Sequence, residues 1–123
     1  MAQKKKKVEF DRMNDEEIVR NIREKAEQKG VNLTPKQGFF AIKLFDYALK
    51  KGIISDDAKF YLFLTVDEMV AIFGCSKAFV SQTLILLNKA EIISRTHIST
   101  QKGIVDSKMK VTKIECGLFC RVS

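Results

Sequence analysis

The stretch that most constrains this fold runs from residue 60 to residue 93, because it encodes two short helices with a tight turn between them. After Phe60 it reads YLFLTVDEMVAIFGCSKAFVSQTLILLNKAEII. Thr65 is a good N-cap, and Glu68 three residues later completes a capping box, so a helix is expected to begin there. Gly74 can adopt the left-handed conformation that ends a helix, and Ser76 can cap the next helix.

Both predicted helices carry apolar residues at helical spacing, which gives each a side to bury. In the first helix these residues are Val66, Met69, Val70 and Phe73. In the second helix they are Val80, Leu84 and Leu87. Two short helices joined around a glycine form a helix-turn-helix unit, whose second helix can enter the major groove of DNA. The functional prediction starts from this unit.

Two further helices are expected before it. Asn14 precedes three acidic residues and should start a helix that ends at Gly30. Its narrow apolar stripe, which includes Ile18 and Ile22, can pack on the domain or pair with the same helix of a second subunit; the sequence leaves both open. The sequence Thr34-Pro35-Lys36-Gln37 starts the next helix, which is apolar around most of its circumference and should be the central helix of the core.

Three segments have the alternation of strands: residues 59–64, 92–98 and 108–115. Residues 99–107 are polar and should form a long turn, so the last two strands make a hairpin directly after the second helix, as a wing does. Residues 116–123 can extend that strand or pack back on the core. We expect a flexible basic arm over residues 1–12 and one domain over 13–123. The predicted fold is α+β and mostly α, with a small antiparallel wing sheet.

The net charge of +7 is unevenly distributed. Residues 75–123 hold eight Lys/Arg against three Asp/Glu, whereas residues 31–74 hold five of each. The excess therefore lies on the second helix and beyond, where a helix-turn-helix protein would meet phosphates. The arm, with Lys4 to Lys7, is either a solubilising tail or a non-specific phosphate contact. No apolar run suits a membrane span or a signal core, so a cytoplasmic location is expected.

Over residues 34–115 the sequence resembles the winged helix-turn-helix family of DNA-binding proteins. The specific part is TVDEMVAIFGCSKAFVSQTLILLNKAEIISR: a capped helix, a glycine turn, a serine-started second helix and an apolar pair before the wing. The segment KFYLFLTVDEMVAIFGCSK is similar to the N-terminal DNA-binding domain of plasmid replication initiators from Gram-positive bacteria. The resemblance implies site-specific binding of double-stranded DNA.

The resemblance also implies roles for individual residues. The side chains matching base-facing positions are Lys77, Ala78, Ser81 and Gln82. Thr65 and Ser76 match helix N-termini whose backbone amides meet phosphate. The residues matching the wing are Lys102, Lys108 and Lys110. Lys89 and Arg95 complete the predicted DNA-binding set.

The second helix departs from a typical base-reading helix, because it has no arginine and exposes apolar bulk. At 100° per residue, Phe79 and Leu86 fall together on one flank, and Ile85 lies on the side opposite the core stripe. Phe79 and Leu86 can pack under the N-terminal helix or the strand. Alternatively, the second helices of two subunits pack together, and the dimer presents only their N-terminal ends and wings to DNA. This arrangement resembles the centromere-binding adaptors of tubulin-type plasmid segregation systems. The interface would then include Phe79, Ile85 and Leu86.

No other chemistry is expected. Cys116 and Cys120, with His97, lack the second close pair that a structural zinc site needs, so neither a metal nor another cofactor is predicted. No phosphate loop or catalytic triad spacing occurs, so an enzyme is not expected. The predicted function is a homodimeric transcriptional regulator. The alternatives are a plasmid or phage maintenance protein that binds centromere or origin repeats, and a winged-helix adaptor that binds a protein partner without reading DNA.

Overall fold

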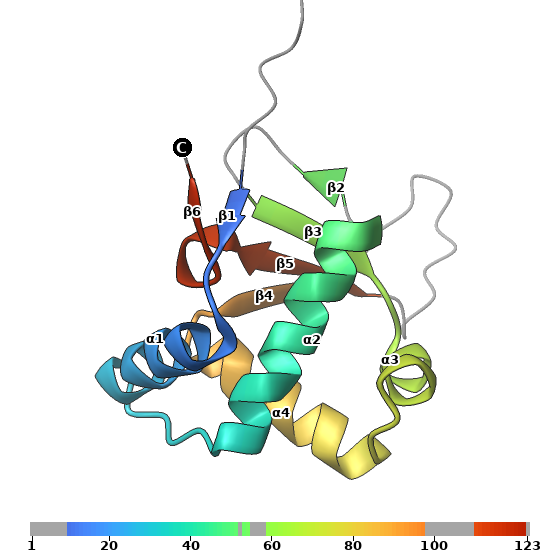
Figure 1. Ribbon diagram of the computed structural model, residues 1–123. Helices are drawn as coiled ribbons and strands as arrows, with labels where there is room; N and C mark the ends of the chain where they lie inside the picture. Colours follow the sequence, from blue (N-terminus) through green and yellow to red (C-terminus); the bar gives the residue numbers. More distant parts are fainter. Residues whose placement is uncertain (1–9, 52, 55–58, 98–109, 123) are drawn as a thin grey trace, which may run out of the picture.

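The computed structural model describes residues 10–51, 53–54, 59–97 and 110–122. Four α-helices, a short 3-10 helix (η1, Cys116–Leu118) and six strands are described (Figure 1). The helices are α1 (Asp15–Gln28), α2 (Pro35–Lys51), α3 (Val66–Phe73) and α4 (Lys77–Lys89). The strands are β1 (Phe10–Arg12), β2 (Ile53–Ile54), β3 (Lys59–Phe63), β4 (Ile93–His97), β5 (Lys110–Glu115) and β6 (Cys120–Val122). The fold class is therefore α+β and mostly α, as predicted.

The main sheet is antiparallel, with the strand order β2-β3-β5-β4, and β1 pairs separately with β6. Ile114 on β5 lies opposite both Phe60 on β3 and Ile93 on β4, and all three side chains are buried. Because side chains alternate across a strand, these residues face the helices and their neighbours in sequence face away. Strands β4 and β5 form the hairpin that was predicted to follow the second helix.

Helix α2 is the centre of the core, as predicted from its apolar circumference. Figure 1 shows α2 in front of the sheet, with α1 and α3 on either side. The ring of Phe45 is fully buried, stacks on Phe119 with centroids 4.4 Å apart, and meets Phe60 edge to face at 5.3 Å. Burial of three aromatic rings at one point makes this contact a main source of stability.

The predicted helix ends are confirmed. The Thr65 hydroxyl accepts a hydrogen bond from the Glu68 backbone N–H, and the Glu68 carboxylate accepts one from the Thr65 backbone N–H. Gly74 ends α3 in the left-handed conformation, with φ of 65°, and Ser76 caps α4. The Asn14 side chain caps α1 by accepting the Glu17 backbone N–H, and Thr34 and Gln37 form a capping box at the start of α2.

Replacing Gly74 with alanine should lower the free energy of unfolding by about 1–2 kcal/mol, because an L-residue pays that cost in the left-handed region. A Cβ atom at Gly74 would meet nothing within 4 Å, so the cost comes from the backbone alone. Gly117→Ala is the matched control, since a Cβ there also meets nothing and its φ is not left-handed. Urea denaturation of both variants measures the difference; equal stabilities would contradict the assigned conformation.

The structure of residues 10–12 and of the C-terminal segment adds to what the sequence predicted. Residues 10–12, assigned to a flexible arm, form β1 and pair with β6. Arg12 adds side-chain contacts, because its guanidinium lies 2.8 Å from carboxylate oxygens of both Asp15 and Asp46. The C-terminal segment packs back on the core rather than extending β5, since Cys116, Phe119 and Cys120 are buried. Lys4 to Lys7 lie outside the described residues.

Ile18 and Ile22 are fully buried within the single chain, in the cluster that contains Leu44 and Phe45. The hypothesis that they pair with α1 of a second subunit is therefore wrong for this fold. The reason is that the narrow apolar stripe of α1 is already covered by α2. The exposed side of α1 is charged and leaves no comparable apolar face.

Candidate nucleic-acid interface

Helices α3 and α4 meet at a sharp angle. They are bent by 113° across the short turn of residues 74–76. On α4 the predicted core stripe of Val80, Leu84 and Leu87 is buried. The opposite side is exposed and consists of Ala78, Gln82, Ile85 and Lys89. The angle and the short turn match those of helix-turn-helix units, and they leave one side of α4 open.

Among the helices that the structure describes, none is both long enough and apolar enough to cross a membrane alone. The bent pair of α3 and α4 reaches that threshold only when the two are taken together, by length and composition.

The N-terminal end of α4 brings several predicted residues together. Ser76, Lys77 and Ala78 are exposed, and the Lys77 amine lies 3.4 Å from a carboxylate oxygen of Asp67 on α3. The hydroxyls of Thr65 and Ser76 are used in capping, since each accepts a backbone N–H of its own helix. A phosphate at these two positions would therefore interact mainly with the positive N-terminal ends of α3 and α4.

On the strand side of α4 lies a groove of about 230 Å³, between α3, α4 and β4. Its lining residues are Val66, Ser81, Leu84, Ile85, Asn88 and Arg95. Arg95 is half-buried, and its Nε donates a hydrogen bond to Oγ1 of Thr112 at 3.1 Å. Burial lowers the pKa of the Arg95 guanidinium from its ordinary value, although an arginine stays charged at neutral pH.

Arg95 forms no ion pair with any acidic residue of the described chain. A partly desolvated cation that donates to a neutral hydroxyl has unused affinity for an anion. Asn88, which the sequence reasoning missed, lines the same groove. Its position seven residues after Ser81 was the available signal, because that spacing places both on one side of a helix.

The other predicted residues are not all part of this surface. Lys89 is exposed but lies twelve residues after Lys77, at the far end of α4, about 18 Å along the axis. Lys110 begins β5, opposite His97. Lys102 and Lys108, which were assigned to the wing, lie outside the described residues.

Phe79 and Leu86 pack within their own chain. The Phe79 ring meets Phe40 of α2 edge to face, with centroids 5.8 Å apart, and Leu86 is half-buried against the core. The prediction that Phe79 and Leu86 pack within their own subunit is therefore confirmed, but Phe79 packs on α2 rather than on α1 or a strand. Ile85, 63% exposed, is the large apolar side chain that α4 leaves to solvent.

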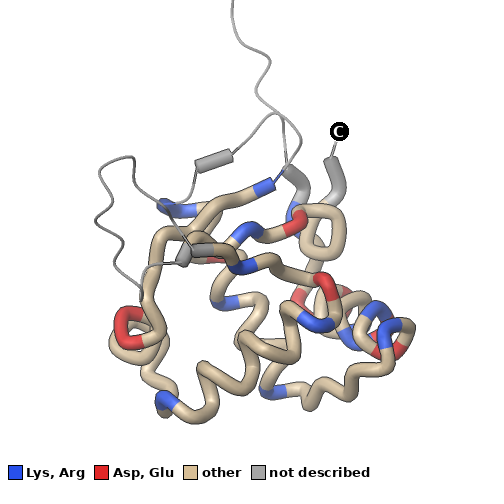
Figure 2. The backbone as a smooth tube through the Cα atoms, turned by 180° about the vertical axis from the view of Figure 1, so that it is seen from behind, with Lys and Arg blue, Asp and Glu red and all other residues tan. Residues whose placement is uncertain are grey.

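Charge is unevenly placed over the described surface. Figure 2 shows α1 with both signs of charge close together, whereas α4 is mostly uncharged. Lys77 and Lys89 are the charged residues of α4, and both are basic. The attraction of this surface for phosphate must therefore come from the ends of α4 and from the neighbouring strands.

The three cysteines belong to no metal-binding cluster in the part of the chain that the structure describes. Cys116 and Cys120 are buried, and the Cys120 thiol donates to the Cys116 carbonyl at 3.4 Å. Over residues 10–51, 53–54, 59–97 and 110–122, no group of three or more His, Cys, Asp or Glu side chains is placed to hold a metal ion.

Comparison of the chain with protein-family models, with characterised proteins and with solved structures finds no match. A functional assignment therefore depends on the geometry of α3, α4 and the β4–β5 hairpin.

Proposed function

We propose that this protein is a winged helix-turn-helix protein that binds double-stranded DNA through α4 and the adjoining β4–β5 hairpin. The observation that carries the proposal is the exposed side of α4 with Arg95 beside it, a half-buried cation without an acidic partner in the described chain. Lys77 and Gln82 supply polar groups on the open side of the helix, where base edges offer hydrogen bonds.

Phosphate contacts dominate the affinity of such proteins and make it depend on salt. The test is fluorescence anisotropy of a labelled random-sequence duplex over a series of salt concentrations. We expect log K to fall linearly with log salt, and Arg95→Gln to reduce the steepness by about one unit because it removes one phosphate contact. Binding that is absent, or that does not respond to salt, would refute DNA recognition.

The task we propose is site-specific transcriptional regulation. The second task, maintenance of a plasmid or phage through binding of centromere or origin repeats, is supported by the sparse charge of α4, which suits contact by its N-terminal end more than by its whole length. Selection of bound fragments from the source genome distinguishes the two. Promoter sites indicate regulation, and clustered repeats beside an origin or partition locus indicate maintenance.

As an alternative to contact with DNA along the open side of α4, we propose that α4 pairs with α4 of a second subunit around Ile85, which would leave only the N-terminal end of α4 and the hairpin to meet DNA. The exposed Ile85 supports this, since the other large apolar residues of α4 are covered by their own chain. Ile85→Glu should then give a folded monomer, with the mass measured by sedimentation velocity and the fold by circular dichroism. Phe79→Glu is not a suitable test, because it would also break the contact with Phe40. A dimer that survives Ile85→Glu excludes this pairing.

The exposed Ile85 also favours the remaining alternative, an adaptor that binds a protein partner through an apolar contact. The salt series separates this alternative from DNA recognition, since apolar association does not weaken steeply with salt.

A further inference from the structure

A second groove lies on the other side of α4, between α2 and the α3–α4 turn. It has a volume of about 440 Å³, within the range of small-molecule sites. Its lining residues are Lys36, Phe39, Phe40, Lys43, Gly74, Cys75, Ser76 and Phe79. No acidic residue is among them, and no part of it belongs to the set predicted to contact DNA except Ser76.

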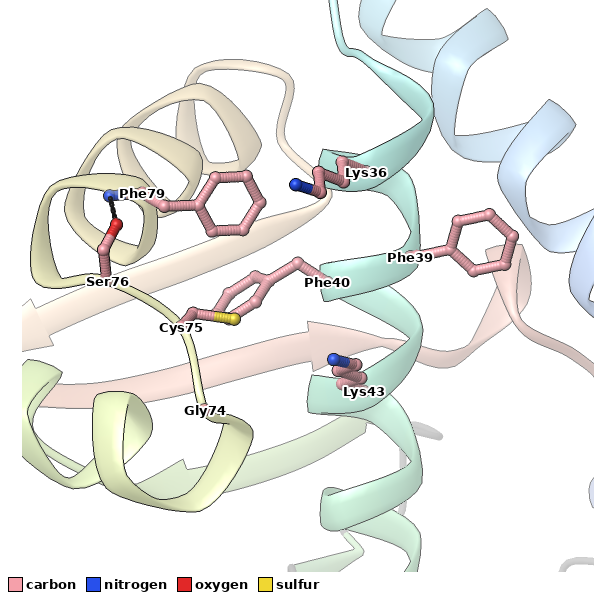
Figure 3. A pocket seen from close by; sticks show the side chains of 8 residues that line it. All are labelled: Lys36, Phe39, Phe40, Lys43, Gly74, Cys75, Ser76 and Phe79. Atoms are coloured by element: carbon pink, nitrogen blue, oxygen red, sulfur yellow. Dashed lines mark hydrogen bonds between the residues drawn. The ribbon is translucent and has the colours of Figure 1, made fainter.

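The floor of this groove is apolar and largely aromatic. Figure 3 shows Phe79 pointing from α4 toward Phe40 on α2, with the Cys75 thiol beside the Phe40 ring. Phe40 meets Phe79 and Phe73 edge to face, at 5.8 and 5.6 Å between centroids. Phe79 and Cys75 remain partly exposed, so ring edges and a soft sulfur are available to a flat apolar ligand.

The rim is cationic. Lys36 and Lys43 are seven residues apart on α2 and lie on the same side of the helix, about 10 Å apart along its axis. Figure 3 shows both amines directed toward the groove. Within the described chain neither amine forms an ion pair. Two uncompensated cations above an aromatic floor complement a ligand with an apolar body and an acidic group.

We propose that this groove binds a small aromatic carboxylate, with the ring against Phe79 and Cys75, over the buried Phe40, and the carboxylate between Lys36 and Lys43. An apolar floor of this kind is poorly matched to a phosphate of the DNA backbone, which has no apolar body to bury. The groove wall includes Gly74 and Cys75, so a bound ligand contacts the turn that joins α3 to α4. The proposal is independent of DNA binding.

The probe is 2-naphthoate, and its uncharged analogue 2-naphthylmethanol is the control ligand. Titration of the ¹⁵N-labelled protein should give saturable shifts of the Gly74, Cys75 and Ser76 amides with naphthoate and much weaker binding of the alcohol. The thiol of Cys75 should also react more slowly with a thiol reagent when naphthoate is bound. Cys75 suits this measurement because Cys116 and Cys120 are buried.

The double variant Lys36→Gln, Lys43→Gln should bind naphthoate about five- to tenfold more weakly, as expected for the loss of two exposed ion pairs. Lys50→Gln, on the same helix but outside the groove, should bind like the natural sequence. All three lysines are exposed, so the variants should keep the thermal stability of the parent. Shifts away from the groove, equal binding of the alcohol, or unchanged binding by the double variant would overturn the proposal. The proposal would also be overturned if the natural sequence did not bind naphthoate and the double variant lost binding of duplex DNA. That result would place both lysines in the DNA interface.

Discussion

Phe45→Ala is expected to lower the free energy of unfolding by about 3–5 kcal/mol, the range found for large aromatic truncations in a core. Phe45 is fully buried and joins three parts of the chain, because it contacts Phe60 of β3 and Phe119 of the C-terminal segment. For a chain of this length, the loss corresponds to a fall in melting temperature of roughly 10–20 °C. Urea denaturation and calorimetry measure both quantities.

Leu49→Ala is the matched control for this prediction. It removes an apolar side chain from the same helix, but Leu49 is 37% exposed and should cost much less. Comparable losses for the two variants would mean that Phe45 is not at the centre of the core. The stacking of Phe119 on Phe45 also predicts that Phe119→Ala and Phe45→Ala are non-additive, because the two rings share one contact.

Lys77→Glu should weaken binding of duplex DNA by at least about tenfold at low salt, because it replaces a cation at the open end of α4 with an anion. The melting temperature should not fall. An acidic residue in the first turn interacts favourably with the helix dipole, which offsets the loss of the exposed pair with Asp67 and the weak repulsion from Asp67 that replaces it. Anisotropy with a labelled duplex measures the affinity, and a thermal melt measures the stability.

Lys50→Glu is the control for this charge reversal, since it changes the net charge equally on the last turn of α2, away from α4. It should reduce DNA affinity only slightly, through long-range electrostatics. Equal losses for Lys77→Glu and Lys50→Glu would mean that binding depends on net charge alone. That outcome would leave α4 without a special role.

Local signals predicted most of the fold. Caps such as the box of Thr65 and Glu68, and the glycine at position 74, are read from a few adjacent residues, so the helix boundaries were predicted closely. The strand β1 could not be predicted in this way. Residues 10–12 are paired by a strand more than a hundred residues later, and no local pattern reports such a partner.

The candidate site was predicted less completely, because burial depends on which element lies opposite. Phe79 and Leu86 were placed correctly on one flank of α4, but the sequence could not show that α2 covers Phe79. The prediction that Ile18 and Ile22 lie in a subunit interface was wrong for the same reason, since both are buried within the chain. Lys36 and Lys43 belong to a helix that the sequence assigned to the core, and only the packing of α2 against the α3–α4 turn brings them to a groove.

The central claim is that the open side of α4 and the neighbouring strand contact DNA. The most direct measurement is a ¹⁵N correlation spectrum of the protein titrated with a random-sequence duplex at low salt. We expect the largest shifts at the amides of residues 76–82 and 93–97, with α1 unaffected. Shifts confined to α1, or a spectrum that the duplex leaves unchanged, would contradict the claim.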